Sequence, residues 1–223
     1  ATTWHIYTVN YDMEVGRIFK DGLVWIPMLR SKVYEGFSHK HFTVKDVGLD
    51  TFTFGALART LEDAEELVKA HEGNVDHKAI GKILGYPDCC TDFFCKVWAK
   101  GIYDPMYEIA MNTDDKEVKG DEVVVYGHPF LNQLTRYVGL RVTPWFPCSF
   151  KCKESVRLAE DIWAKLMREY DDEAFDFYVE LVKEGIRWDS LYGIAEVTVG
   201  DKLKIVTNTY PRNERRVVVY KVM

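Results

Sequence analysis

Long apolar segments are absent from this 223-residue sequence. The longest strongly apolar run, Gly22 to Leu29, is far shorter than the roughly 20 residues of a membrane-spanning helix, and it contains Pro27. The sequence also lacks a charged-then-apolar leader and any Asn-x-Ser/Thr acceptor for glycosylation. We therefore expect a protein that has no membrane partner and is located in the cytoplasm.

Motifs for nucleotide binding and for hydrolase chemistry are also absent: there is no P-loop, no Gly-x-Gly-x-x-Gly and no Gly-x-Ser-x-Gly elbow. The net charge of −6 argues against a surface that wraps a polyanion. One basic and aromatic stretch, YPRNERRVVVYK from Tyr210 to Lys221, is better interpreted as an edge strand protected by charge. We do not expect a nucleic-acid partner.

The order of predicted elements favours an α+β fold with strands at the N-terminus, a central helical region and antiparallel strands at the C-terminus. Alternating bulky and polar residues from Trp4 to Leu29 predict strands joined by a hairpin at Lys20-Asp21-Gly22. Strands are also predicted for residues 122–126, 140–143, 192–206 and 215–222. We expect a single domain, 1–223, with 186–223 as a β subdomain packed on it.

Capping residues and closing glycines place the central helices. Thr60 caps a first helix that ends near Gly73, Asn74 caps a second, and Asp88 opens a third that ends near Gly101. Further helices are predicted from Pro129 to Gly139, from Pro147 to about Tyr170, and from Asp171 to Gly185. Residues 111–121 are expected to form a charged loop.

Cysteine is scarce, with five residues, and it is concentrated in two stretches. GYPDCCTDFFC holds Cys89, Cys90 and Cys95, and PWFPCSFKC holds Cys148 and Cys152. In a reducing compartment such cysteines are expected to be ligands, reactive thiols or core residues before they are disulfides, although hyperthermophile proteins do use intracellular disulfides.

Helical spacing divides these sulfurs by face. Cys90 shares an apolar stripe with Phe94, Val97 and Trp98, so we expect it to point inward, whereas Cys95 lies well round the helix and is interpreted as buried packing. If Pro147 starts a helix, Cys148 and Cys152 also face the core together. We therefore expect Cys90, Cys148 and Cys152 to meet at one site.

Four interpretations of that site remain open. The cysteines pack as core residues, or Cys90 forms a structural disulfide with Cys148 or Cys152. Alternatively, zinc or an iron–sulfur cluster binds these three sulfurs with Cys89 or a histidine completing the set. Finally, a thiol catalyses a reaction, favoured by its place at a helix N-terminus.

Three stretches, DHKAIGKILGYPDCCTDFF, HPFLNQLTRYVGLRVTPWFPCSFKC and IRWDSLYGIAEV, resemble the signature blocks of an uncharacterised archaeal and bacterial family, a domain of unknown function. The resemblance covers roughly residues 55 to 206 and implies no reaction. Thr143-Pro144-Trp145-Phe146 stands where the family pattern has a histidine. The matching positions are His77, Gly85, Tyr86, Pro87, Cys90, Asn132, Arg136, Pro147, Cys148, Ser149, Cys152, Trp188, Gly193 and Glu196.

Several polar residues are candidates for chemistry beside the cysteines. His77 is positioned near a helix start, where it would act as base or ligand. Asn132 and Arg136, four residues apart on one predicted helix, would hold a small anionic substrate while Cys90 or Cys148 serves as nucleophile or ligand. His39 and His41 are two residues apart, so in a strand both rings would point to one face, a geometry compatible with a metal. His128 precedes another predicted helix start.

The leading hypothesis is a cytoplasmic metal, iron–sulfur or thiol/redox protein acting on a small anion, whose reaction the sequence does not identify. The runner-up is a disulfide-stapled domain that binds protein or RNA without catalysis. The metal hypothesis draws its ligands from Cys89, Cys90, Cys148 and Cys152. Nothing in the sequence predicts an oligomeric state.

Overall fold

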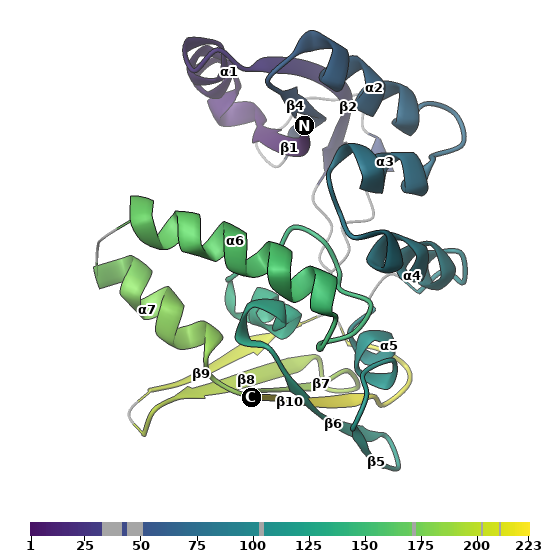
Figure 1. Cartoon of the computed structure of the whole chain (residues 1–223), viewed down its shortest axis with the longest axis vertical. Coiled ribbons are helices and arrows are strands. Elements are labelled where there is room, and N and C mark those ends of the chain that lie inside the picture. The colour runs from purple at the N-terminus through teal and green to yellow at the C-terminus, as the bar shows by residue number, and fades with distance from the viewer. Residues whose placement is uncertain (33–41, 44–50, 103–104, 171–172, 202, 210) are drawn as a thin grey trace. The chain divides into compact units, whose positions relative to one another are not determined.

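The computed structural model describes residues 1–32, 42–43, 51–102, 105–170, 173–201, 203–209 and 211–223 (Figure 1). They form two compact units, Ala1–Thr91 and Asp92–Met223, and the division falls inside helix α4, Asp88–Trp98. The predicted α+β class is confirmed, with strands first, helices in the middle and strands last. The prediction of a single domain with a subdomain at 186–223 stays a prediction.

The first unit is built on a four-stranded sheet with the strand order β1-β4-β2-β3, in which every neighbouring pair is antiparallel. Its elements are β1 (Thr2–Tyr7), a 3-10 turn (Thr8–Asn10), α1 (Tyr11–Lys20), β2 (Val24–Lys32), β3 (Phe42–Thr43), β4 (Thr51–Ala58), α2 (Leu61–His71) and α3 (His77–Ile83).

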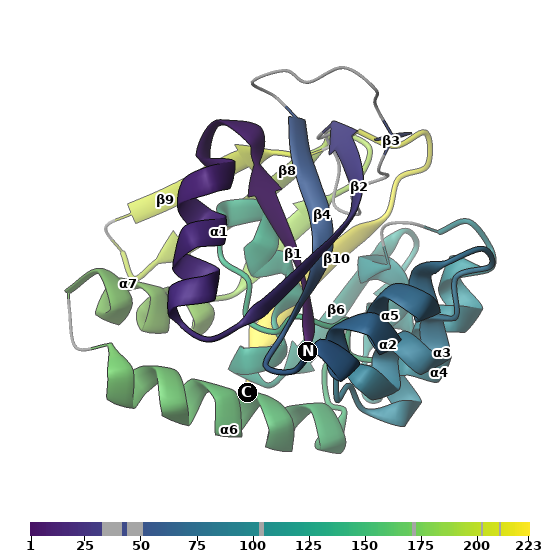
Figure 2. The same cartoon turned by 90° about the horizontal axis from the view of Figure 1, so that it is seen from above.

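Strand β4 is the centre of this unit because both of its faces are buried. Ala56 and Ala58 pack with Leu67 of α2, while Leu57, on the opposite face, packs with Ile18 of α1. This division follows from the two-residue period of a strand. Figure 2 shows α1 and α2 to either side of β4.

The predicted hairpin at Lys20-Asp21-Gly22 is wrong, because α1 occupies Tyr11–Lys20. Tyr11, Val15 and Ile18 are spaced for one helical face, and they pack with Trp25 in the same cluster. Asp12 and Glu14 in the first turn, with basic residues in the last, suit the helix dipole. Read with the two-residue period of a strand, the bulky residues of this segment predict a strand; read with the helical period, they form one face of a helix.

Helices α2 and α3 lead toward the first cysteine stretch. Thr60 caps α2 as predicted, since its side chain accepts a hydrogen bond from the Asp63 N–H. The predicted cap at Asn74 is wrong: Asp76 caps α3 by accepting from Lys78 N and Ala79 N. Gly85, at φ 71°, turns the chain after α3 in a conformation that favours glycine.

The second unit contains a six-stranded sheet with the order β5-β6-β10-β7-β8-β9. Besides α4, its elements are α5 (Met106–Met111), β5 (Glu117–Lys119), β6 (Glu122–Gly127), η2 (Pro129–Leu131), η3 (Gln133–Val138), α6 (Lys153–Glu169), α7 (Glu173–Val182), β7 (Ile186–Asp189), β8 (Ile194–Val199), β9 (Leu203–Asn208) and β10 (Val217–Val222). The strands after α7 are antiparallel as predicted, but β10 also pairs with β6 in parallel.

Helices α6 and α7 lie over one face of this sheet (Figure 1). Ser155, Ala159 and Trp163 recur every four residues on α6 and are buried. Trp163 stacks on Phe130 with 4.7 Å between ring centroids, and its indole N–H donates to the Val142 carbonyl at 2.9 Å. These contacts fix α6 against the chain that precedes it.

Four predictions between residues 111 and 170 need correction. The helix from Pro129 to Gly139 is two 3-10 segments that meet at Asn132, and residues 140–143 form no strand. The longest helix begins at Lys153, not at Pro147. Part of the predicted loop 111–121 is strand β5, which pairs with β6. For the delayed start of the longest helix the reason is non-local, because Asn112 and Thr113 bond to the backbone of residues 148 and 150.

Candidate metal centre

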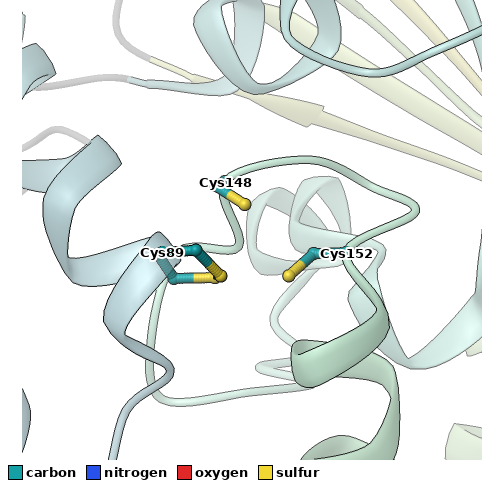
Figure 3. Close-up of side chains that lie close together, drawn as sticks. Cys89, Cys148 and Cys152 are labelled. Atoms are coloured by element: carbon teal, nitrogen blue, oxygen red, sulfur yellow. The ribbon is translucent and has the colours of Figure 1, made fainter.

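Four cysteines meet at one point of the structure: Cys89, Cys90, Cys148 and Cys152 have sulfur atoms that all lie within 4.8 Å of one another. Figure 3 shows Cys89 on α4 facing Cys148 and Cys152 across a small space. In the part of the chain that the structure describes, these residues form the one group of three or more His, Cys, Asp or Glu side chains with metal-binding spacing. The predicted meeting of Cys90, Cys148 and Cys152 is confirmed, and Cys89 joins them.

The first pair of sulfurs is positioned by the start of α4. Pro87 precedes the helix, and its carbonyl accepts hydrogen bonds from Cys90 N at 2.9 Å and Thr91 N at 3.0 Å. Adjacent helical residues diverge by about 100°, so Cys90 is buried, with 1% exposed, while Cys89 is exposed. Even so, their sulfurs lie 3.8 Å apart.

Aromatic stacking holds the body of α4 near the second cysteine stretch. Phe94, one turn after Cys90, stacks on Phe146 with 6.3 Å between centroids and 9° between planes. Phe94 also stacks on Trp98 at 4.9 Å. Because Phe146 comes two residues before Cys148, this contact sets the distance between the helix and the cysteine loop.

The second pair lies on a loop, residues 148–152, that we call the cysteine loop. Its backbone is held by three bonds from elsewhere: Asn112 Nδ2 donates to the Cys148 carbonyl at 2.7 Å, Phe150 N donates to Thr113 Oγ1 at 3.0 Å, and His128 N donates to the Phe150 carbonyl at 3.2 Å. Within the loop, Cys152 N donates to Ser149 O.

Cys152 ends the cysteine loop and begins α6. It occupies the N-cap position, where its carbonyl accepts from Val156 N at 2.9 Å, and its side chain makes no capping hydrogen bond. With 9% of its surface exposed, it is nearly as sheltered as Cys90, whereas Cys148 is half-buried. Cys89, Cys90 and Cys152 therefore lie at helix N-termini, whose dipoles stabilise the negative charge of thiolates, whereas Cys148 lies in the loop before α6.

The disulfide alternative predicts a bond from Cys90 to Cys148 or Cys152, and the structure forms neither. All five cysteines lie in the described part of the chain, and none of them is in a disulfide. Cys95 is half-buried and does not belong to the cluster, which agrees with its predicted separation from Cys90.

Asn132 and Arg136, predicted to hold an anionic substrate, form hydrogen bonds with backbone carbonyls. Asn132 is fully buried, and its Nδ2 donates to the Glu184 carbonyl at 3.3 Å. Arg136 donates to the Thr143 carbonyl at 3.3 Å, and its guanidinium lies 4.7 Å from the centre of the Phe146 ring. Asn132 lies between the two 3-10 segments and Arg136 lies in the second, so they do not share a face as an i, i+4 pair on one α-helix. Their roles toward an anion stay predictions.

His77 is the first residue of α3 and is not part of the sulfur group. Burial lowers the pKa of His77 below its usual 6.5, the neighbouring His71 lowers it further, and Asp76 partly opposes both. A role for this histidine as base stays a prediction. His39 and His41 lie outside the described residues, and His128 accepts from the Phe130 N–H as the cap of η2.

Three signature residues near the C-terminus, Trp188, Gly193 and Glu196, lie in or beside the six-stranded sheet. The indole of Trp188 donates to Thr209 Oγ1 at 3.2 Å and stacks on Tyr137, and Glu196 pairs with Lys204 at 3.1 Å. Gly193 has φ 60°, and a side chain there would collide with the Thr209 carbonyl. These contacts explain the three residues without a reaction.

The basic stretch after Tyr210 contributes to a cavity of about 320 Å³ lined by Trp188, Ser190, Arg212, Asn213 and Arg216, among others. Arg216 is paired with Glu108 at 2.7 Å and with Glu214 at 3.0 Å, which reduces its charge toward a ligand. A small anionic partner stays a prediction.

Sequence reasoning missed Asn112 and Thr113, which support the cysteine loop. Both lie in MNTDDKEVKGD, whose charge and polarity predict only a solvated loop. Thr113 is instead fully buried, and its hydroxyl donates to the Ile109 carbonyl at 2.8 Å while it accepts from Phe150. No local pattern marks a residue whose partner lies 37 positions away.

Comparison with known proteins gives one match. The profile of a family described as "Protein of unknown function (DUF483)" matches residues 64–185, a range that includes all four clustered cysteines. No curated protein and no solved structure matches the chain. Among the residues that the structure describes, no helix has the length and apolar character needed to cross a membrane.

Proposed function

The chain belongs to the DUF483 family, whose function is unknown, and we propose that it is a zinc protein in which Cys89, Cys90, Cys148 and Cys152 bind one ion. The observation that carries this proposal is the convergence of four sulfurs within 4.8 Å of one another. A set of four cysteine thiolates is one of the ligand sets of closed tetrahedral zinc sites.

The spacing of the sulfurs favours one ion. Zinc–sulfur bonds of about 2.3 Å at tetrahedral angles put two sulfurs about 3.8 Å apart. Cys89 and Cys90 have that separation, 3.8 Å. In a four-iron cluster each cysteine binds a different iron, so its sulfurs stand farther apart than those around a single ion. A four-iron cluster would therefore need all four sulfurs to stand farther apart, including those of the adjacent Cys89 and Cys90.

Four protein ligands fill a tetrahedron, and a closed site of this kind stabilises a fold, whereas a catalytic zinc keeps one position open. The ion would thus fasten the irregular cysteine loop to the start of α4. A reducing compartment such as the cytoplasm would keep the four thiols available for the metal.

Metal analysis of protein purified without oxygen, chelator or metal-affinity resin tests this proposal. We expect one zinc per chain, and X-ray absorption should give four sulfur neighbours at about 2.3 Å. Cys90→Ser should lose the metal, whereas Cys95→Ser, the same chemical change outside the cluster, should retain it.

Two results would overturn the single-ion proposal. One is wild-type protein that takes up no zinc after anaerobic refolding with excess zinc. The other is several irons with acid-labile sulfide per chain, which would identify a cluster instead.

A further inference from the structure

The four cysteines of the cluster differ sharply in their exposure to solvent. Cys90 is 1% exposed and Cys152 is 9% exposed, while Cys148 is half-buried and Cys89 is exposed. A metal held by these residues would therefore present Cys89 more openly than its other ligands to molecules in solution. Oxidants attack cysteine sulfur according to its thiolate character and its exposure.

We infer that Cys89 is a modification site, at which hydrogen peroxide oxidises the metal-bound sulfur and so causes the ion to leave. This inference rests on the proposed zinc site. Zinc has no redox chemistry of its own, so the electrons come from the thiolates and the ion keeps its charge of +2.

The first step forms a sulfenic acid. The Cys89 thiolate attacks one oxygen of hydrogen peroxide; a sulfur–oxygen bond forms, the oxygen–oxygen bond breaks, and hydroxide leaves. In the second step a neighbouring thiolate attacks the oxidised sulfur, a sulfur–sulfur bond forms, and a second hydroxide leaves. The net change is two thiolates to one disulfide and one peroxide to two hydroxides, which take up two protons to become water.

Cys90 cannot easily be the second thiolate, although it is adjacent. Bridged cysteines have Cα atoms about 4.4–6.8 Å apart. Consecutive Cα atoms are only about 3.8 Å apart across a trans peptide. Cys90 is also held in the first turn of α4 by the bond from its N–H to the Pro87 carbonyl.

Cys148 is the best placed partner for Cys89. It lies within 4.8 Å of Cys89 by sulfur, is half-buried and belongs to an irregular segment, so a small shift of the cysteine loop brings the two together. Cys152 is more sheltered, and both its N–H and its carbonyl are bonded at the start of α6. Loss of Cys89 and Cys148 leaves two sulfurs, too few for a structural zinc site.

The test follows zinc release from the loaded wild-type protein with a chromogenic zinc indicator after addition of hydrogen peroxide. We expect release of the bound zinc, recovery of binding after reduction, and a Cys89–Cys148 disulfide by peptide mass spectrometry. Cys89→Ser should lose the fast phase of release, whereas Cys95→Ser should release zinc as the wild type does.

A second measurement needs no variant and so does not depend on whether Cys89→Ser folds. A probe that traps sulfenic acid, added with peroxide to the wild-type protein, should label Cys89 before any other cysteine. Labelling that begins elsewhere, or a zinc-loaded protein that keeps its metal in peroxide, refutes this inference and leaves the zinc site standing. A protein that binds no zinc at all refutes the proposed function instead.

Discussion

The two stretches that supply the sulfurs are built on different principles. Cys89 and Cys90 lie in a regular helix whose own backbone and Phe94 stacking fix their directions. The cysteine loop has no repeating structure and depends on bonds from Asn112, Thr113 and His128. The position of a metal ligand on a helix is thus set by the helix itself, whereas the position of a ligand on this loop is set by residues far away in the sequence.

Removal of the metal should produce the largest loss of stability. It should also affect the two cysteine stretches to different degrees. A ligand that binds only the folded state stabilises it by about 4 kcal/mol at 1,000 times its Kd. We expect chelation to lower the melting temperature strongly and to increase hydrogen exchange more in residues 148–152 than in α4. Equal loss of protection in both stretches would contradict the comparison.

A matched pair of threonine substitutions should give a smaller effect. Thr113→Val removes the acceptor of the buried Phe150 N–H, so we expect a stability loss of about 1–3 kcal/mol. Metal affinity should fall about tenfold, as for other residues that orient ligands.

Thr91→Val is the control for that change on the helix side. Its buried hydroxyl has no hydrogen-bond partner among the described residues, so valine should leave stability and metal affinity nearly unchanged. Denaturant unfolding and competition with a metal indicator measure both quantities. If Thr91→Val weakens metal binding as much as Thr113→Val, the helix needs as much outside support as the loop.

The smallest effect concerns His77, on the helix that precedes α4. Because its pKa is lowered by folding, the unfolded chain binds more protons once the pH falls below 6.5, and the free energy of unfolding decreases there. The contribution is fully present above 6.5. NMR titration should give a pKa below 6.5, and His77→Gln should weaken the acid dependence of stability while retaining zinc. Loss of zinc in that variant would make His77 part of the site.

The difference between the helix and the cysteine loop also explains which features could be predicted from the sequence. Helical spacing was enough to direct Cys90 inward, and Thr60 marked the start of α2. Pro147 was predicted to start a helix, but α6 begins at Lys153. Backbone groups of the cysteine loop form hydrogen bonds with Asn112 and Thr113, far away in the sequence, instead of helical bonds. Such bonds leave no periodic trace, and neither does the parallel pairing of β10 with β6.

Strand β10 has a consequence for the order of events during protein synthesis. It lies between β6 and β7, and its Tyr220 packs edge-on against Phe150 and donates to the His128 carbonyl at 2.6 Å. Phe150 of the cysteine loop therefore packs on a residue that lies about 70 positions later in the chain and is synthesised after it. On the ribosome, the four thiols emerge well before their support, so the nascent chain passes through a period in which its metal ligands are synthesised but not yet arranged.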